Sequence, residues 1–137
     1  MTEIIATLAF DSWMDEFPRL RATNVEDRHL IYEGGGVILD LVVKKNKRGQ
    51  SVHIGGQVLP GDDLVDAACG VPVMLEQGTQ VSRTQTNALG EFSFQSVPDG
   101  SCNLAITFEN RTFLVRGLGD KNPRNWRIVP IASSGGA

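Results

Sequence analysis

Apolar and polar residues alternate along most of the chain, and a period of two is typical of β-strands. The clearest run is VILDLVV at residues 37–43, which is rich in the branched aliphatic residues that strands favour. Similar runs occupy residues 52–59, 71–75, 81–86, 91–97, 103–108, 113–116 and 126–131. The alternation predicts five large side chains on one inner face of the core: Phe92, Phe94, Leu104, Ile106 and Phe108.

Short turn sequences separate these runs at intervals of about 8–12 residues. They contain Gly, Asn, Asp and Pro, which supply the backbone conformations of turns. We expect Asn87 and Gly90 to provide the left-handed conformations of a tight turn, and residues 98–100 to close a hairpin. This arrangement predicts an all-β fold, a single antiparallel β-sandwich of about seven to nine strands.

Three segments depart from simple alternation. The glycine pair Gly55-Gly56 lies inside a strand-like run and indicates a β-bulge or a close backbone approach. Residues 3–10 are candidates for an added strand. Residues 11–27 contain the one plausible helical turn, which Pro18 interrupts.

The central part of the chain carries an ordered pattern of strand and turn residues. It reads V.V.L, then T.T, then N..G.F.F..VP.G followed by Leu. The matching positions are Val71, Val73, Leu75, Thr84, Thr86, Asn87, Gly90, Phe92, Phe94, Val97, Pro98, Gly100 and Leu104. This pattern resembles the carboxypeptidase-regulatory-like, transthyretin-like family of β-sandwich domains over about half of the chain, and Gly56-Gln57-Val58 is similar to the opening strand of that family. Cys102 stands where the family usually has an aromatic residue.

A second, more distant similarity covers the N-terminal part. It rests on an L.FDS segment and an R.L.Y..G...LDL segment, with Leu8, Phe10, Asp11, Ser12, Arg28, Leu30, Tyr32, Gly35, Leu39, Asp40 and Leu41 at the matching positions. These segments resemble small bacterial sandwich proteins encoded near extracytoplasmic-function-type sigma factors. The resemblance implies, by analogy alone, a role in bacterial signalling or stress response.

We expect a single domain over residues 1–137, because no linker or internal repeat divides the chain. Its expected parts are N-terminal strands and hairpins in residues 3–55, a transthyretin-like part in residues 56–131 and a flexible tail of small residues at 132–137.

Composition excludes several classes of protein. The 137 residues are 41% hydrophobic and 21% charged, as in ordinary globular proteins, which excludes disorder, collagen and coiled coil as descriptions of the whole chain. The 16 acidic and 13 basic residues give a net charge of −3, which argues against a general nucleic-acid or membrane binder. Glu3 lies where a secretory signal would be basic, so we expect a cytoplasmic protein.

The cysteines and histidines form no recognisable metal site. Cys69 and Cys102 make no CxxC motif and have no His near them in sequence, so we expect free thiols and no zinc. His29 and His53 are interpreted as ordinary strand residues, with a metal pair as the alternative.

Enzymes occur on related sandwiches, but their residue sets are missing from this sequence. The Tyr-Arg-Gly-Ser motif of hydroxyisourate hydrolases does not occur. Intradiol dioxygenases bind iron with two Tyr and two His, whereas Tyr32 is the single Tyr here. No pair of carboxylates is singled out by spacing, and no serine lies in a G-x-S-x-G motif. We therefore predict no catalytic residue and no cofactor.

Two segments are candidate protein interfaces. Basic residues crowd around one tryptophan in the C-terminal quarter: Arg111, Arg116, Lys121, Arg124, Trp126 and Arg127. Arginine with an aromatic residue is the composition of interface hot spots, although Trp126 is equally consistent with a residue that caps the core. The second candidate is the predicted helical turn with Trp13, Met14 and Phe17, which either packs on the sandwich, covers an edge strand or binds a partner.

The function predicted from these patterns is a non-catalytic protein-interaction or regulatory accessory module whose partner is another protein. A carbohydrate-binding module is the alternative, but it needs several exposed aromatic residues. The chain has six Phe, two Trp and one Tyr, and most of them alternate as core residues do. An enzyme on a transthyretin-like scaffold is a further alternative.

Overall fold

The computed structural model describes residues 2–14, 27–46, 51–60, 68–108 and 110–118. These residues form ten strands and one short 3-10 helix. In chain order the elements are β1 (Thr2–Ile5), β2 (Thr7–Asp11), η1 (Ser12–Met14), β3 (Arg28–Gly34), β4 (Val37–Lys45), β5 (Ser51–Pro60), β6 (Pro72–Gln77), β7 (Gln80–Gln85), β8 (Glu91–Pro98), β9 (Cys102–Thr107) and β10 (Arg111–Leu118).

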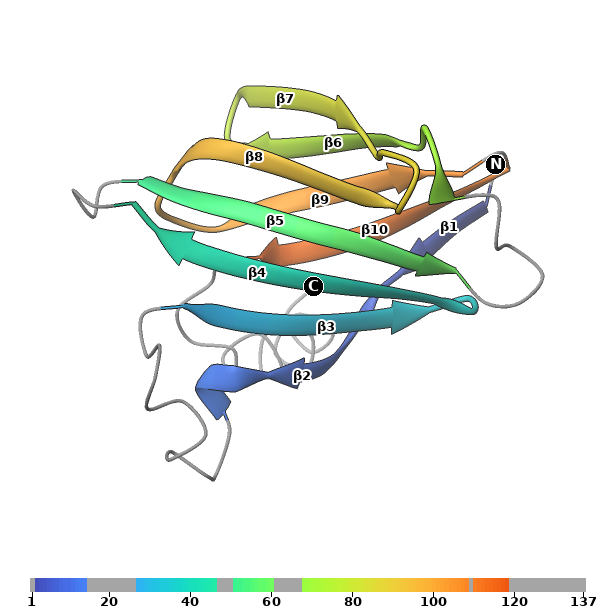
Figure 1. Cartoon of the computed structure of the whole chain (residues 1–137), viewed down its shortest axis with the longest axis horizontal. Coiled ribbons are helices and arrows are strands. Elements are labelled where there is room, and N and C mark those ends of the chain that lie inside the picture. Colours follow the sequence, from blue (N-terminus) through green and yellow to red (C-terminus); the bar gives the residue numbers. More distant parts are fainter. Residues whose placement is uncertain (1, 15–26, 47–50, 61–67, 109, 119–137) are drawn as a thin grey trace, which may run out of the picture.

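The strands form two five-stranded sheets that stack face to face (Figure 1). Sheet A has the order β1-β10-β9-β6-β7, and sheet B has the order β2-β3-β4-β5-β8. The all-β sandwich predicted from the sequence is confirmed. The described residues contain ten strands rather than about seven to nine, and β1 pairs with β10 in parallel, so the sandwich is not purely antiparallel.

Three strands lie outside the predicted runs: β3, and two from the first eleven residues, which cross from one sheet to the other. The predicted run at residues 126–131 lies outside the described residues. β1 pairs with β10 at the edge of sheet A, and β2 pairs with β3 at the edge of sheet B. Ala6, between them, is 3% exposed and donates its backbone N–H to the carbonyl of Leu114 at 2.8 Å. The candidate added strand at residues 3–10 is therefore two short strands that join the layers.

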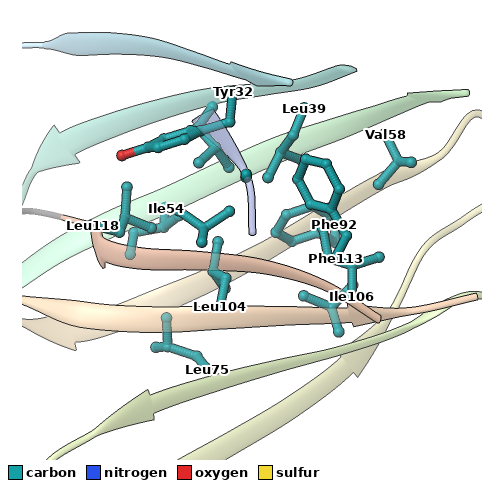
Figure 2. Packing of buried hydrophobic residues seen from close by; sticks show 14 of the residues in the cluster. Tyr32, Leu39, Ile54, Val58, Leu75, Phe92, Leu104, Ile106, Phe113 and Leu118 are labelled. Carbon is teal, nitrogen blue, oxygen red and sulfur yellow. The ribbon is translucent and has the colours of Figure 1, made fainter. Parts of the chain in front are cut away.

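Alternating side chains of both sheets fill the space between the layers (Figure 2). The five large residues predicted in the core are all buried. The prediction that they share one inner face was wrong, because Phe92 and Phe94 project from sheet B whereas Leu104 and Ile106 project from sheet A. Residues 98–100 connect the two sheets and do not close a hairpin.

The turn at residues 87–90 also connects the sheets, and one of its two key residues acts differently from the prediction. Gly90 adopts a left-handed conformation with φ of 79°, as expected. Asn87 does not, since every described residue with positive φ is a glycine. The Asn87 side-chain oxygen instead accepts hydrogen bonds from the backbone N–H groups of Leu89 and Glu91, both at 2.9 Å.

One glycine of the β5 pair leaves space in the core for an aromatic ring. Gly56 pairs with Leu41 on one side and with Phe92 on the other. A Cβ atom at Gly56 would lie 2.4 Å from Cζ of Phe92 and 2.7 Å from Cδ2 of Leu41, so the aromatic ring occupies the space that a side chain would need. The close approach predicted from the glycine pair is therefore confirmed at Gly56.

We predict that Gly56→Ala destabilises the fold by about 1–3 kcal/mol, because the methyl group overpacks the core. Gly55→Ala is the matched control, since the nearest atom to its Cβ is Cε1 of His53 at 3.4 Å. It should leave stability within about 1 kcal/mol of the wild type or raise it slightly. Urea denaturation of both variants measures the difference, and equal stabilities would contradict this account of the core.

Candidate functional site

A groove of about 720 Å³ crosses the outer face of sheet B and continues over the neighbouring end of β7. We call it the sheet-B groove. It is lined mostly by polar residues of four strands and of the turn after β7, including Asp40, Lys44, His53, Gln57, Thr84, Gln85, Asn87, Glu91 and Ser93. It is open to solvent and shallow, which suits an extended ligand better than an enclosed one.

The floor of the groove is set by Gly55, the first glycine of the β5 pair. Gly55 lies between Val42 of β4 and Ser93 of β8 in the sheet register. Because successive residues of a strand point to opposite faces, Gly56 faces the core and Gly55 faces the groove. The absence of a side chain at Gly55 leaves a low point in the middle of the sheet surface.

Charged residues of opposite sign border this low point on its two sides. Asp40, Gln57 and Glu91 lie side by side across β4, β5 and β8 in one row of the register. Lys44 and His53 are paired in the row on the other side of Gly55. The Lys44 side chain is 57% exposed and lies 4.0 Å from a carboxylate oxygen of Asp27. The groove therefore presents carboxylates along one border and a cation along the other.

A histidine beside the groove is held by one of these carboxylates. Nε2 of His29 and Oδ1 of Asp40 lie 2.5 Å apart. The His29 ring also contacts Phe10 edge to face, with ring centroids 5.6 Å apart, and Phe10 is 39% exposed. His29 and His53 lie on β3 and β5 with β4 between them. Among the described residues, no group of three or more His, Cys, Asp or Glu side chains is placed to hold a metal ion.

The border formed by β8 is also a free sheet edge within the described part of the chain. Val58 donates its backbone N–H to the carbonyl of Gly90 at 2.9 Å, and Asn87 bonds to the outward backbone groups of Glu91. Hydrogen-bonded and non-hydrogen-bonded pairs alternate along an antiparallel ladder. The backbone N–H and C=O of Ser93 are therefore directed away from β5, toward the free edge of sheet B beside the groove.

The basic cluster predicted as an interface is only partly described. Arg111 is half-buried, and its Nη1 donates to the carbonyl of Gly35 at 2.9 Å, which ties β10 to the β3–β4 turn. Arg116 is exposed on the outer face of sheet A. The other members lie outside the described residues, so the cluster itself stays a prediction: Lys121, Arg124, Trp126 and Arg127.

In the second predicted interface, the partly buried Trp13 ring contacts Arg28 of β3, and a role in partner binding stays a prediction. Trp13 belongs to helix η1, which directly follows β2. The guanidinium carbon of Arg28 lies 4.3 Å from the centroid of the Trp13 ring. Oδ1 of Asp11 accepts a hydrogen bond from the Trp13 backbone N–H at 3.0 Å, as the side chain of a helix N-cap does. Met14 ends η1, and Phe17 lies outside the described residues.

A buried ion pair, which no sequence pattern predicts, anchors this region. Nε and Nη2 of Arg28 donate to the two carboxylate oxygens of Asp11 at 3.1 and 2.7 Å. The two side chains are only 5% and 1% exposed. The pair joins positions 17 residues apart, and no pattern among 16 acidic and 13 basic residues singles it out.

Both cysteines are free thiols, and they differ in environment. Cys69 is exposed, whereas Cys102 is buried at the start of β9 with its Sγ 3.5 Å from the carbonyl of Leu118. Burial raises the pKa of the Cys102 thiol from 9.0 to about 11. Cys102 therefore acts as a small core residue and not as a nucleophile.

No family model matches this chain, and neither does any curated protein or solved structure. The resemblance to transthyretin-like domains thus rests on the quoted residues alone. The described residues include no helix that is long and apolar enough to cross a membrane.

We predict that Arg28→Met lowers the free energy of unfolding by about 3–5 kcal/mol, because it leaves the Asp11 carboxylate buried without its partner. Lys44→Met is the control, since it breaks an exposed ion pair that is worth at most about 1 kcal/mol. Chemical denaturation compares the two variants. Similar small losses for both would show that the buried pair does not anchor β2.

We predict that native protein treated with an alkylating reagent below pH 9.0 is labelled at Cys69 and not at Cys102. The folded state favours the Cys102 thiol, so its contribution to stability is present below pH 9.0 and is lost as pH rises toward about 11. Intact mass spectrometry with and without denaturant measures the labelling. Rapid double labelling of folded protein, or a mass lower by two hydrogen atoms, would contradict the assignment.

Proposed function

We propose that this protein is a non-catalytic interaction module that binds an extended segment of a partner protein in the sheet-B groove. The observation that carries the proposal is the arrangement around Gly55, with carboxylates on one border of the low point and a cation on the other. A polypeptide with charges of both signs matches such a surface, and charge complementarity then sets its direction and register.

The free edge of β8 supports an extended peptide over other ligands. An extended segment that lies beside β8 can bond to the outward N–H and C=O of Ser93 and so add a strand to sheet B. Strand addition draws affinity from main-chain hydrogen bonds and specificity from alternate side chains. In this arrangement β8 lies between the segment and β5, so long alternate side chains of the segment extend over Ser93 toward the low point at Gly55.

The composition of the groove also favours a peptide over a carbohydrate. Sugar rings bind well where exposed aromatic faces accept their apolar side, and Phe92, the aromatic residue that lines this groove, is only 6% exposed. Phe10, at 39% exposed, lies beyond β3 and contacts His29 instead.

We predict that Gly55→Val weakens peptide binding at least about ten-fold, because the new side chain fills the low point of the groove. The assay selects peptides from a displayed random library on the wild-type protein and measures their dissociation constants with each variant. Gln95→Val is the matched control, because Gln95 is exposed on the outer face of the same strand, β8, outside the groove.

Circular dichroism and thermal unfolding establish that both variants are folded, and valine suits a strand position. Equal affinity of wild type and folded Gly55→Val would exclude the groove as the peptide site. Failure to select any peptide, together with binding on a glycan array that Gly55→Val abolishes, would replace the peptide with a carbohydrate.

A further inference from the structure

The outer face of sheet A carries an apolar row that crosses four of its strands. Ile5 of β1, Leu114 of β10, Ala105 of β9 and Met74 of β6 are direct cross-strand neighbours, and Arg83 of β7 ends the row. Ile5 is 47% exposed, and the other three apolar residues are half-buried and do not belong to the core. The described elements form two layers only, so none of them covers this face.

Charges of opposite sign lie next to this row, on either side of β9. Glu76 of β6 pairs with Asn103 of β9. On the other side of β9, the side-chain oxygen of Asn103 accepts a hydrogen bond from the N–H of Gly117 at 3.0 Å. Arg116 of β10 therefore lies beside Asn103, at the same height along the strands as Glu76. Arg116 and Glu76 are both exposed. β9 is the middle strand of sheet A, so the two charges lie at equivalent positions about the centre of the face.

We infer that two copies of this chain associate through the outer faces of sheet A, about a two-fold axis parallel to β9. This axis places β10 of one copy over β6 of the other. Leu114 then packs on Met74 of the second copy, and Arg116 meets Glu76 of the second copy. Ala105 packs on its own equivalent, where its small side chain lets the sheets approach. The Leu114–Met74 and Arg116–Glu76 contacts each occur twice, and the Ala105 contact lies on the axis, as a self-complementary two-fold interface requires.

The edges of the face agree with the same axis. The rotation lays β1 of one copy over β7 of the other. Ile5 then lies opposite the aliphatic stem of Arg83 of the second copy, and Glu3 lies one register row away from that arginine, opposite Gln85. Five strands at about 4.8 Å spacing and about 20 Å of length give each face roughly 480 Å². The two faces together cover about 1,000 Å², which is the lower end of what a specific interface needs.

This association uses a different face of the molecule from most of the proposed peptide groove. The part of the groove on the outer face of sheet B stays accessible in both copies, and only its end at β7 borders the dimer interface. A dimer with two grooves binds a partner that carries two matching segments more tightly than a single groove binds one segment.

Sedimentation equilibrium of the full chain tests the inference with a charge swap. The wild type should dimerise in the micromolar to submillimolar range. Arg116→Glu and Glu76→Arg should each raise the dimer dissociation constant about ten-fold or more, because each substitution places like charges together at two symmetric sites. The double variant Arg116→Glu with Glu76→Arg should return it to within about three-fold of the wild type.

Glu33→Arg is the control, because Glu33 is exposed on β3 of sheet B and should leave the dimer unchanged. Circular dichroism verifies the fold of every variant, and recovery in the double variant separates a lost contact from a lost fold. A wild type that stays monomeric throughout the range overturns the inference. A dimer that single reversals leave intact, or that the double variant fails to recover, overturns it too.

Discussion

The packing of one aromatic ring against one glycine organises this structure. Phe92 of β8 enters the core over Gly56, where any side chain on β5 would collide with it. The alternation of a strand then requires the next residue, Gly55, to face outward. The same glycine pair therefore admits a large core residue on one face of sheet B and leaves a low point on the other. The position of the sheet-B groove follows from the way the core is filled.

Two further interactions connect the sheets and hold the edges of the sandwich. The chain crosses from sheet A to sheet B at Ala6, so the first eleven residues contribute an edge strand to each layer. The Asp11–Arg28 ion pair fixes the end of β2 to the start of β3, and Trp13 stacks on the arginine. A buried pair of this kind costs desolvation, and its geometry with two hydrogen bonds offsets part of that cost. The Trp13 ring, which the sequence predicted as part of a partner interface, thus also contacts this ion pair, and the interface itself stays a prediction.

The sequence predicted the strands well because their signal is local. Period-two alternation identified the runs that became β4 to β10, and the glycine pair correctly indicated a close approach. Assignment of the strands to sheets is not local. Residues 87–90 and 98–100 have the composition of hairpin turns, yet each leads from one sheet to the other, since tertiary packing decides which edge the next strand joins.

Neither the groove nor the ion pair could be predicted from the sequence, for a related reason. Asp40, Gln57 and Glu91 come from three strands and become neighbours only through the register of sheet B. Asp11 and Arg28 are far apart in sequence, and each is one of many charges. Register and pairing depend on contacts between distant segments, which a single sequence does not encode in any local pattern.

The central claim is that the sheet-B groove binds a partner segment, and amide chemical-shift mapping tests it most directly. A selected peptide is titrated into isotopically labelled protein, and the amide signals are followed. The account predicts the largest shifts at Gly55, Gln57 and Ser93, with little change on the outer face of sheet A. Shifts confined to that opposite face, around Arg116 and Met74, would contradict it.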